Sequence, residues 1–138
     1  MKAETYLERI PKIDALLENL KREYQRQITL SDDIGGGLSF AGRVQTSSNP
    51  NKRAAAVGRY IDIEGRIKAL EAERDMIIRT LEVLPTPEYK LLYKIYVEGY
   101  MVKQLPYELN KSYDWVRKTK AKALRHIQKI LDSRKDTP

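Results

Sequence analysis

Hydrophobic side chains recur at spacings of three and four residues along two long stretches of the chain. Within Ala3–Gln27 the repeating positions are Ile10, Ile13, Leu17, Leu20 and Tyr24. Within Ala54–Leu84 they are Tyr60, Ile63, Ile67, Leu70, Arg74, Ile77, Leu81 and Leu84. A sustained seven-residue period is typical of helices that pack along one face. The pattern therefore predicts an all-α chain whose N-terminal part is an antiparallel, coiled-coil-like hairpin of two long helices.

Two residues interrupt these series. Pro11 predicts either a first helix that begins near this residue or a bend at it, because proline removes a backbone amide from the helix interior. Arg74 occupies a position that is otherwise apolar. Three explanations are open for Arg74: it sets the register between the two long helices, it pairs with a neighbouring carboxylate, or the contact between the two helices ends there.

The stretch from Thr29 to Arg53 has no hydrophobic period and contains Gly35–Gly37 and Pro50. We expect a flexible loop at residues 29–53. Its glycines do not form a phosphate-binding loop, because no Gly-Lys-Ser/Thr follows them and no strand precedes them. A weaker hypothesis places three basic residues of this loop on a phosphate backbone, namely Arg43, Lys52 and Arg53.

The segment Pro85-Thr86-Pro87 ends the second long helix, since proline disfavours helical geometry in the residue before it. We expect Thr86 to cap the next helix and Pro87 to be its first residue. The boundary divides the chain into a helical hairpin, residues 1–84, and a second domain, residues 85–138.

Three shorter helices are predicted in this second domain. The first spans about Pro87–Val97 and closes at Glu98-Gly99, where glycine permits the turn. The second spans about Val102–Leu109. The turn Asn110–Ser112 then provides a serine N-cap for a last helix from Tyr113 to about Ser133. Two short helices, a tight turn and a helix that begins with basic residues predict a helix-turn-helix.

Composition narrows the class of protein. The formal net charge is +7, and from Lys111 onward nine basic residues accompany only three acidic ones. A localised positive charge is typical of a surface that binds a polyanion. The chain has no cysteine, which excludes disulfides and thiol catalysis and fits a reducing cytoplasm. No stretch has the length and hydrophobicity of a membrane span or of a signal-peptide core, so no membrane association is expected.

The C-terminal motif also resembles a known family. Tyr96–Gly99, Gln104-Leu105-Pro106, Leu109, Ser112, Val116 and Ala123-Leu124 resemble the promoter-binding helix-turn-helix of sigma factors, region 4. With a long helical N-terminal part before it, the chain resembles the RinA/ArpU-type transcriptional regulators of phages. The family has a small residue where this chain has Pro106. We therefore expect the second short helix to start late or to kink.

The outward residues at the start of the last helix are the candidate base contacts, because the first turns of such a helix face base edges in the major groove. They are Tyr113, Asp114, Arg117, Lys118 and Ala121. Arg117 or Lys118 can donate to guanine, and Asp114 can accept from cytosine. The candidate phosphate contacts are Lys103, Lys111, Ser112, Trp115, Lys120, Lys122 and Arg125.

Other residues that attract attention fit structural roles better. His126 is the only histidine and has no cysteine or suitably spaced carboxylate beside it, so neither a catalytic nor a metal site is predicted. The stripe of Tyr89, Tyr93, Tyr96 and Tyr100 has helical spacing, which favours packing over base stacking. No cofactor is expected.

These observations predict a sequence-specific regulator of transcription that is not an enzyme and binds double-stranded DNA in the cytoplasm of a bacterial host. RNA polymerase is a candidate second partner, and a homodimer is the favoured assembly. The alternative is a phage DNA-packaging or helical assembly protein with nonspecific affinity for DNA.

Overall fold

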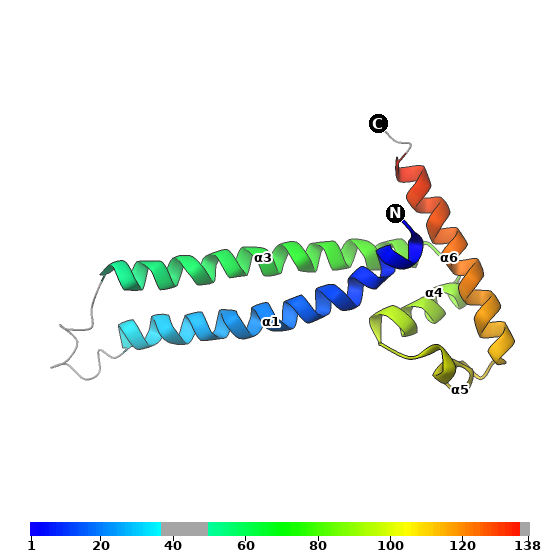
Figure 1. The fold of residues 1–138 in the computed structure, drawn as a ribbon, viewed down its shortest axis with the longest axis horizontal. Coiled ribbons are helices and arrows are strands. Elements are labelled where there is room, and N and C mark those ends of the chain that lie inside the picture. The colour runs from blue at the N-terminus through cyan, green and yellow to red at the C-terminus, as the bar shows by residue number, and fades with distance from the viewer. Residues whose placement is uncertain (37–49, 136–138) are drawn as a thin grey trace. The chain divides into compact units, whose positions relative to one another are not determined.

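The structure is a computed structural model that describes residues 1–36 and 50–135 (Figure 1). Within these ranges all regular structure is helical and no strand is present, which confirms the all-α class. The α-helices are α1 (Ala3–Gly36), α3 (Pro50–Glu82), α4 (Thr86–Leu92), α5 (Leu105–Leu109) and α6 (Tyr113–Lys135). A π-helical segment, Tyr93–Val97, and a 3-10 turn, Val102–Gln104, connect α4 to α5. Among the described helices, none combines the length and the apolar composition that a membrane crossing requires.

The predicted loop at residues 29–53 is wrong at both of its ends. Helix α1 continues to Gly36, and α3 already begins at Pro50. Extending an existing helix costs far less than starting one, so the lack of a hydrophobic period does not end α1. Proline is well suited to the first turn of a helix, which explains the early start of α3. Residues 37–49, including Arg43, lie outside the described part of the chain, as do the side chains of Lys52 and Arg53.

The residues of both hydrophobic series are buried or half-buried. Ile10 and Ile13 on α1 and Leu81 on α3 are fully buried, and Ile77 on α3 is nearly so. The series on α1 begins earlier than predicted, at Ala3 and Leu7, which are also buried. Pro11 lies inside α1 without ending it. The helix therefore does not start at the proline.

The chain forms two compact units, Met1–Asp14 with Ala72–Pro138 and Ala15–Glu71. We call them unit 1 and unit 2. The division within the structure falls inside α1 and α3. The expected domain boundary between Leu84 and Pro85 stays a prediction.

Polar contacts in unit 1 join the start of α1 to α3 and α6. The Arg9 guanidinium donates to the Glu73 carboxylate at 2.9 Å, and Arg74 donates to Asp14 at 2.6 Å. Of the three explanations for a basic residue at position 74, the structure provides a neighbouring carboxylate. Near the end of α6, Arg134 donates to the Tyr6 and Thr80 hydroxyls at 3.2 and 2.9 Å. These hydrogen bonds satisfy Thr80, whose exposed fraction is only 1%.

The start of α4 differs from the prediction. Pro85 is the N-cap residue, Thr86 is already helical, and no side chain caps this end. Pro85 has extended geometry, with φ of −55° and ψ of 149°, which a proline adopts without strain. The start of α4 is therefore set by the backbone restriction of the two prolines and not by a hydrogen bond from the Thr86 hydroxyl.

The two turns after α4 follow the sequence signals. The π-helical segment ends as the Glu98 amide donates to the Tyr93 carbonyl at 3.0 Å, and Gly99 then takes a φ of +81°. This φ lies in the left-handed region, where glycine carries no side-chain penalty. Pro106 lies in the first turn of α5, after the 3-10 turn. The expectation that this helix starts late is confirmed.

Candidate nucleic-acid interface

The turn between α5 and α6 sets the point at which α6 begins. Asn110 adopts the left-handed conformation, with φ of 55°, and the Lys111 amide donates to the Pro106 carbonyl at 3.1 Å. The Ser112 Oγ accepts from the Trp115 amide at 3.0 Å. This hydrogen bond satisfies one of the free amides of the first turn, as expected for a serine N-cap. The turn and cap together explain why the helix starts at Tyr113.

A small apolar cluster in unit 1 fixes which side of α6 faces inward. Leu91 of α4, Leu105 of α5 and Val116 of α6 are each fully buried and pack together. Ile95 and Trp115 are half-buried against them. Helices α4 and α5 both contact α6, and Figure 1 shows them beside its first turns. Because Val116 points into this cluster, its neighbours on the opposite side of α6 must point outward.

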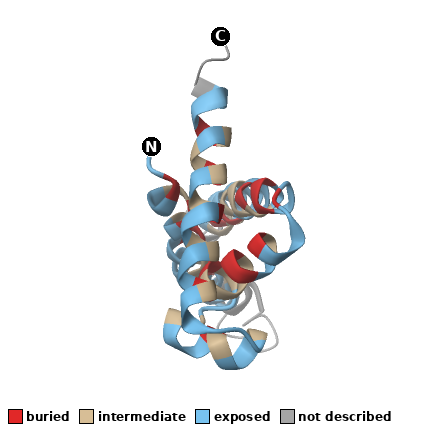
Figure 2. Cartoon of the chain, turned by 90° about the vertical axis from the view of Figure 1, so that its right-hand side faces the viewer, coloured by how far each residue is buried: buried red, intermediate tan, exposed pale blue. Residues whose placement is uncertain are grey.

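Further along α6 the buried side continues with Ala123, Ile127 and Leu131. Ile130, between the last two of these positions, is only half-buried. In Figure 2 the upright helix that ends near the C label carries red, buried segments between tan and pale ones. The inward stripe thus continues to the last turns of α6.

All five candidate base contacts are exposed. Tyr113 is 57% exposed, and the side chains of Arg117 and Lys118 are 68% and 73% exposed. Asp114 and Ala121 are also exposed. The structure therefore brings the predicted residues together on the outer side of the first turns of α6.

Asp114 organises the charges of this surface. Its carboxylate accepts from Arg117 Nη2 at 3.1 Å and from Lys118 Nζ at 3.0 Å. The hydrogen bonds from Lys118 and then Arg117 lower the pKa of Asp114 below its usual value. The aspartate stays ionised at neutral pH and holds both cations beside it. The sequence did not predict these pairs, although the spacings of three and four residues on a helix permit them.

The candidate phosphate contacts have mixed accessibility. Five of them are exposed, namely Lys103, Lys111, Ser112, Lys122 and Arg125. Trp115 and Lys120 are half-buried. The Lys111 ammonium lies 5.4 Å from the centre of the Trp115 ring, within the range of a cation–π interaction. Trp115 thus packs both against the apolar cluster and under a lysine.

The tyrosine stripe serves packing. Tyr96 is 9% exposed, Tyr100 packs against the apolar cluster, and the rings of Tyr89 and Tyr93 lie 5.5 Å apart. Burial raises the pKa of Tyr96 to about 12, and Glu4 and Glu8 add to the effect. Each of the four tyrosines is thus buried or in contact with a neighbouring side chain.

His126 has a partner that the sequence did not reveal. Its Nδ1 lies 2.6 Å from Oε2 of Glu88, and Glu88 is only 4% exposed. The contact joins the first turn of α4 to α6. The two residues are 38 positions apart, so no local spacing rule relates them. Within residues 1–36 and 50–135, no group of three or more metal-ligating side chains occurs that could hold a metal ion.

Comparisons with protein-family models, with curated proteins and with solved structures find no match to this chain.

Proposed function

We propose that the chain is a sequence-specific double-stranded DNA-binding protein that regulates transcription through a helix-turn-helix formed by α4, α5 and α6. In this proposal α6 enters the major groove with its first turns. The observation that supports it most directly is the outward position of Arg117 and Lys118, with Val116 buried between α4 and α5. An α-helix of ordinary width fits the major groove, and arginine and lysine there donate to guanine.

The electrostatics of unit 1 also support a polyanionic ligand. Lys111, Lys122 and Arg125 are exposed around the same helix. Contacts from such residues to phosphates provide most of the salt-dependent affinity of DNA-binding proteins and fix the register on the duplex. The site carries one acidic residue, Asp114, which pairs with Arg117 and Lys118, so both cations must leave this carboxylate before they can contact DNA. We propose that this competition lowers the affinity for nonspecific DNA.

The proposal also assigns a role to the two N-terminal helices, α1 and α3. Within unit 1, Tyr6 contacts Thr80 and Asp14 contacts Arg74. The residue numbers of the contacting pairs therefore increase along α1 while they decrease along α3. This order supports an antiparallel hairpin. We propose that the hairpin serves dimerisation and that RNA polymerase is a second partner, as in a regulator of the RinA/ArpU type.

The experiment is selection of bound fragments from random DNA, followed by competition binding to the selected site. Arg117→Ala should weaken binding to that site by about 1–3 kcal/mol and relax the preference at one base pair. Lys122→Ala is the matched control. It should weaken binding to all sequences alike and reduce the dependence on salt, because a phosphate contact carries no sequence information.

Two results would contradict the proposal. If selection enriched no sequence, the alternative of an assembly protein with nonspecific affinity would be favoured. If Arg117→Ala weakened all sequences equally, the assignment of Arg117 to base contact would be wrong.

A further inference from the structure

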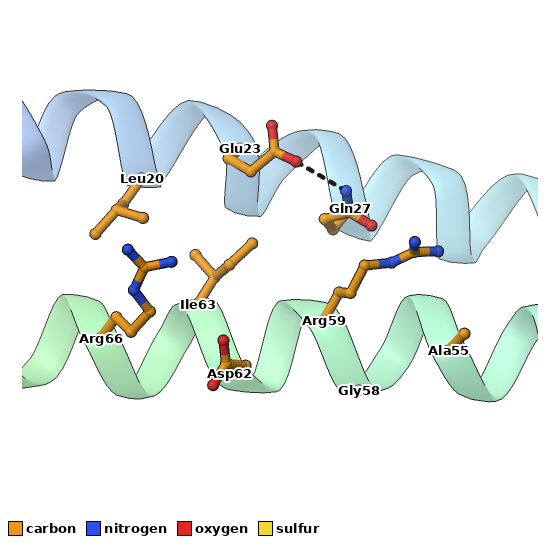
Figure 3. Close-up of a pocket in the computed structure, with 9 residues that line it drawn as sticks. All are labelled: Leu20, Glu23, Gln27, Ala55, Gly58, Arg59, Asp62, Ile63 and Arg66. Atoms are coloured by element: carbon orange, nitrogen blue, oxygen red, sulfur yellow. Dashed lines mark hydrogen bonds between the residues drawn. The ribbon is translucent and has the colours of Figure 1, made fainter.

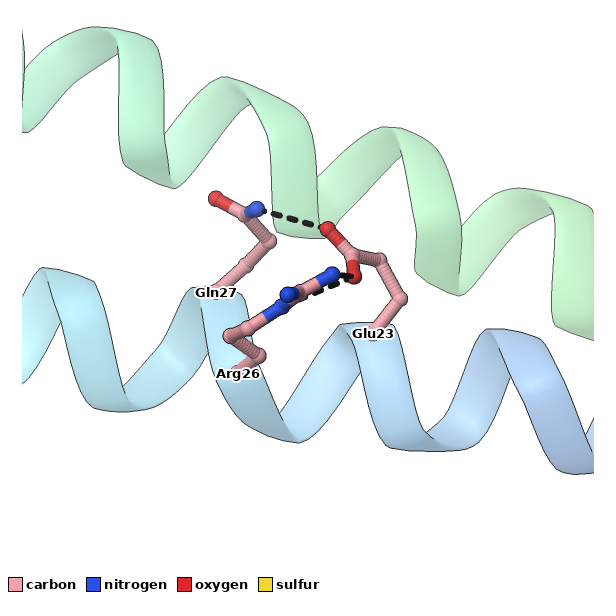
Figure 4. A network of polar contacts seen from close by, with 3 residues as sticks. All are labelled: Glu23, Arg26 and Gln27. Atoms are coloured by element: carbon pink, nitrogen blue, oxygen red, sulfur yellow. Dashed lines mark hydrogen bonds and ion pairs between the residues drawn. The ribbon is translucent and has the colours of Figure 1, made fainter.

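Glu23 and Asp114 each hold two donors of their own helix, but in different surroundings. Glu23 on α1 lines a groove between α1 and α3 in unit 2 (Figure 3). It accepts hydrogen bonds from Arg26 and from Gln27 (Figure 4). These hydrogen bonds lower its pKa, the one from Arg26 most strongly, and the charge of Arg59 on α3 adds to the effect. A neighbouring helix thus encloses one side of Glu23, whose side chain keeps 32% of its surface exposed.

Asp114 on α6 has the same arrangement on an open surface. One oxygen of its carboxylate, Oδ1, accepts from Arg117 at 3.1 Å, and the other, Oδ2, accepts from Lys118 at 3.0 Å. All three side chains are more than half exposed. A ligand can therefore reach the carboxylate as well as its two cations.

The two ion pairs of Asp114 are weak enough to be exchanged. Water screens exposed charges, so a pair of this kind on a helix surface shifts an equilibrium by at most about fivefold. A base edge in the major groove offers aligned donors and acceptors at a contact from which water is partly removed, where hydrogen bonds are stronger. Asp114 thus holds Arg117 and Lys118 in the free protein without preventing them from leaving for a better partner.

The spacing of Asp114 and Arg117 matches neighbouring base pairs. The two residues lie three positions apart, which is roughly 4.5 Å along a helix. Base pairs are stacked about 3.4 Å apart. In the major groove a cytosine offers an amino donor that suits a carboxylate, and a guanine offers two acceptors that suit an arginine. A cytosine and a guanine that are one or two base pairs apart can therefore bind Asp114 and Arg117 at the same time.

We propose that Asp114 couples two base contacts by exchanging partners. Its Oδ1 gives up Arg117 and accepts from the amino group of a cytosine, and Arg117 then donates to a guanine nearby. Lys118 stays on Oδ2 and compensates the charge of the carboxylate beside the phosphates. This inference rests on the proposed DNA-binding function and adds to it the chemistry of the target, which is a cytosine and a guanine that are recognised together.

The exchange predicts that the two base pairs do not contribute independently to affinity. When the cytosine is replaced, Arg117 can return to Asp114, so the contact with the guanine is weakened as well. Replacing both bases should then raise the Kd little more than replacing one of them. Independent contacts would instead multiply their effects on the Kd.

The test is selection of bound fragments from random DNA with the full chain, followed by competition binding to variants of the selected site. The wild type should select a cytosine and a guanine one or two base pairs apart. Each single base change should raise the Kd about ten- to a hundredfold. The double change should add less than about threefold to the larger of the two single effects.

Asp114→Asn keeps the size of the side chain and removes its charge. It should raise the affinity for random-sequence DNA about three- to tenfold, because the carboxylate no longer competes with phosphate for Arg117 and Lys118. The base selected at its position should change from cytosine to adenine, with which asparagine forms two hydrogen bonds. In the new site the effects of the two base pairs should multiply.

Asp132→Asn is the matched control. It removes the same charge from an exposed position on α6, roughly 27 Å further along the helix. It should leave the selected bases, the affinity for random-sequence DNA and the coupling of the two base pairs unchanged.

The outcomes separate this inference from the proposed function. A wild type that selects no sequence would overturn both. A wild type that selects a site without the cytosine, or whose two base pairs act independently, would overturn the inference alone. The inference would also be wrong if Asp114→Asn weakened binding to all DNA, since Asp114 would then hold Arg117 in place for its contact and not compete for it.

Discussion

The two compact units bury their helices to different extents. In unit 1 Leu7, Ile10 and Ile13 have no exposed surface, and neither do Leu91 and Leu105. In unit 2 the most buried apolar residues, Leu17, Ile63 and Ile67, keep 7–8% of their surface exposed. Unit 1 thus contains completely buried apolar side chains, whereas no apolar side chain whose burial is described in unit 2 is withdrawn completely.

Unit 2 also places polar groups in its seam. Tyr24 packs edge-on against Tyr60, with ring centres 6.0 Å apart, and its hydroxyl donates to Glu64 at 3.3 Å. Gln27 continues the same series of positions toward the end of α1. Polar groups in a helical seam specify register at some cost in stability. Unit 1 therefore holds α6 through buried apolar contacts, whereas the seam of unit 2 includes polar groups that bond to one another.

The largest effect should come from the core of unit 1. Leu105→Ala removes a fully buried side chain from the cluster with Leu91 and Val116, and should cost about 2–5 kcal/mol of unfolding free energy. Leu20→Ala in unit 2 is the matched change and should cost less, roughly 1–2 kcal/mol, since Leu20 is only half-buried. Urea unfolding can be followed by the fluorescence of Trp115, which packs on the unit 1 cluster, and by circular dichroism. Equal costs for the two variants would contradict the comparison.

A smaller effect should appear at high pH. Burial raises the pKa of Tyr96 to about 12 from a usual value of 10. The neutral ring is favoured in the folded state, so this stabilisation is complete below pH 10 and is lost as the pH rises toward 12. At about 1.4 kcal/mol for each pKa unit, the loss approaches roughly 3 kcal/mol.

Tyr96→Phe should remove this part of the pH dependence, measured by urea unfolding from pH 9 to 11.5. Tyr24→Phe is the control from unit 2. Burial raises the pKa of Tyr24 as well, with help from Glu64, but Tyr24 is half-buried and the change should be smaller. A larger change in pH dependence for Tyr24→Phe than for Tyr96→Phe would contradict the conclusion that unit 1 buries its side chains more completely than unit 2.

The N-cap of α6 should give the smallest effect on stability. Ser112→Ala removes the acceptor for the Trp115 amide and should cost about 1 kcal/mol. Ser112→Asp should be close to neutral, because a carboxylate also caps this amide. Thermal unfolding measures both. If the alanine variant lost no stability, the cap would not contribute to fixing the start of α6.

Local signals in the sequence predicted the turns that precede α5 and α6. The serine of Asn110–Ser112, the glycine at position 99 and the proline at position 106 each act on backbone groups a few residues away. The exposure of Arg117 and Lys118 also followed from helical spacing around Val116. These signals act within about two turns, although the equally local pairs of Asp114 with Arg117 and Lys118 were not predicted.

Contacts between distant segments could not be predicted in this way. Glu88 meets His126, and Arg134 meets Tyr6 and Thr80, over separations of 38 to 128 residues. No periodicity records such a pairing, because each side chain is ordinary on its own helix. The length of α1 was missed for a different reason. The sequence contains no residue before Gly35 that actively ends a helix, and the absence of a hydrophobic period was a weaker signal than we assumed.

The most direct test of the account is to follow the backbone amides of the full chain by NMR during titration with the DNA site obtained by selection. The account predicts that the amides from Tyr113 to Ala121 shift most strongly, together with those of Lys111 and Ser112. The amides of unit 2 on α3, from Ala54 to Ala69, should change little. Strong shifts on unit 2 with an unchanged start of α6 would contradict the central claim that the exposed first turns of α6 bind DNA.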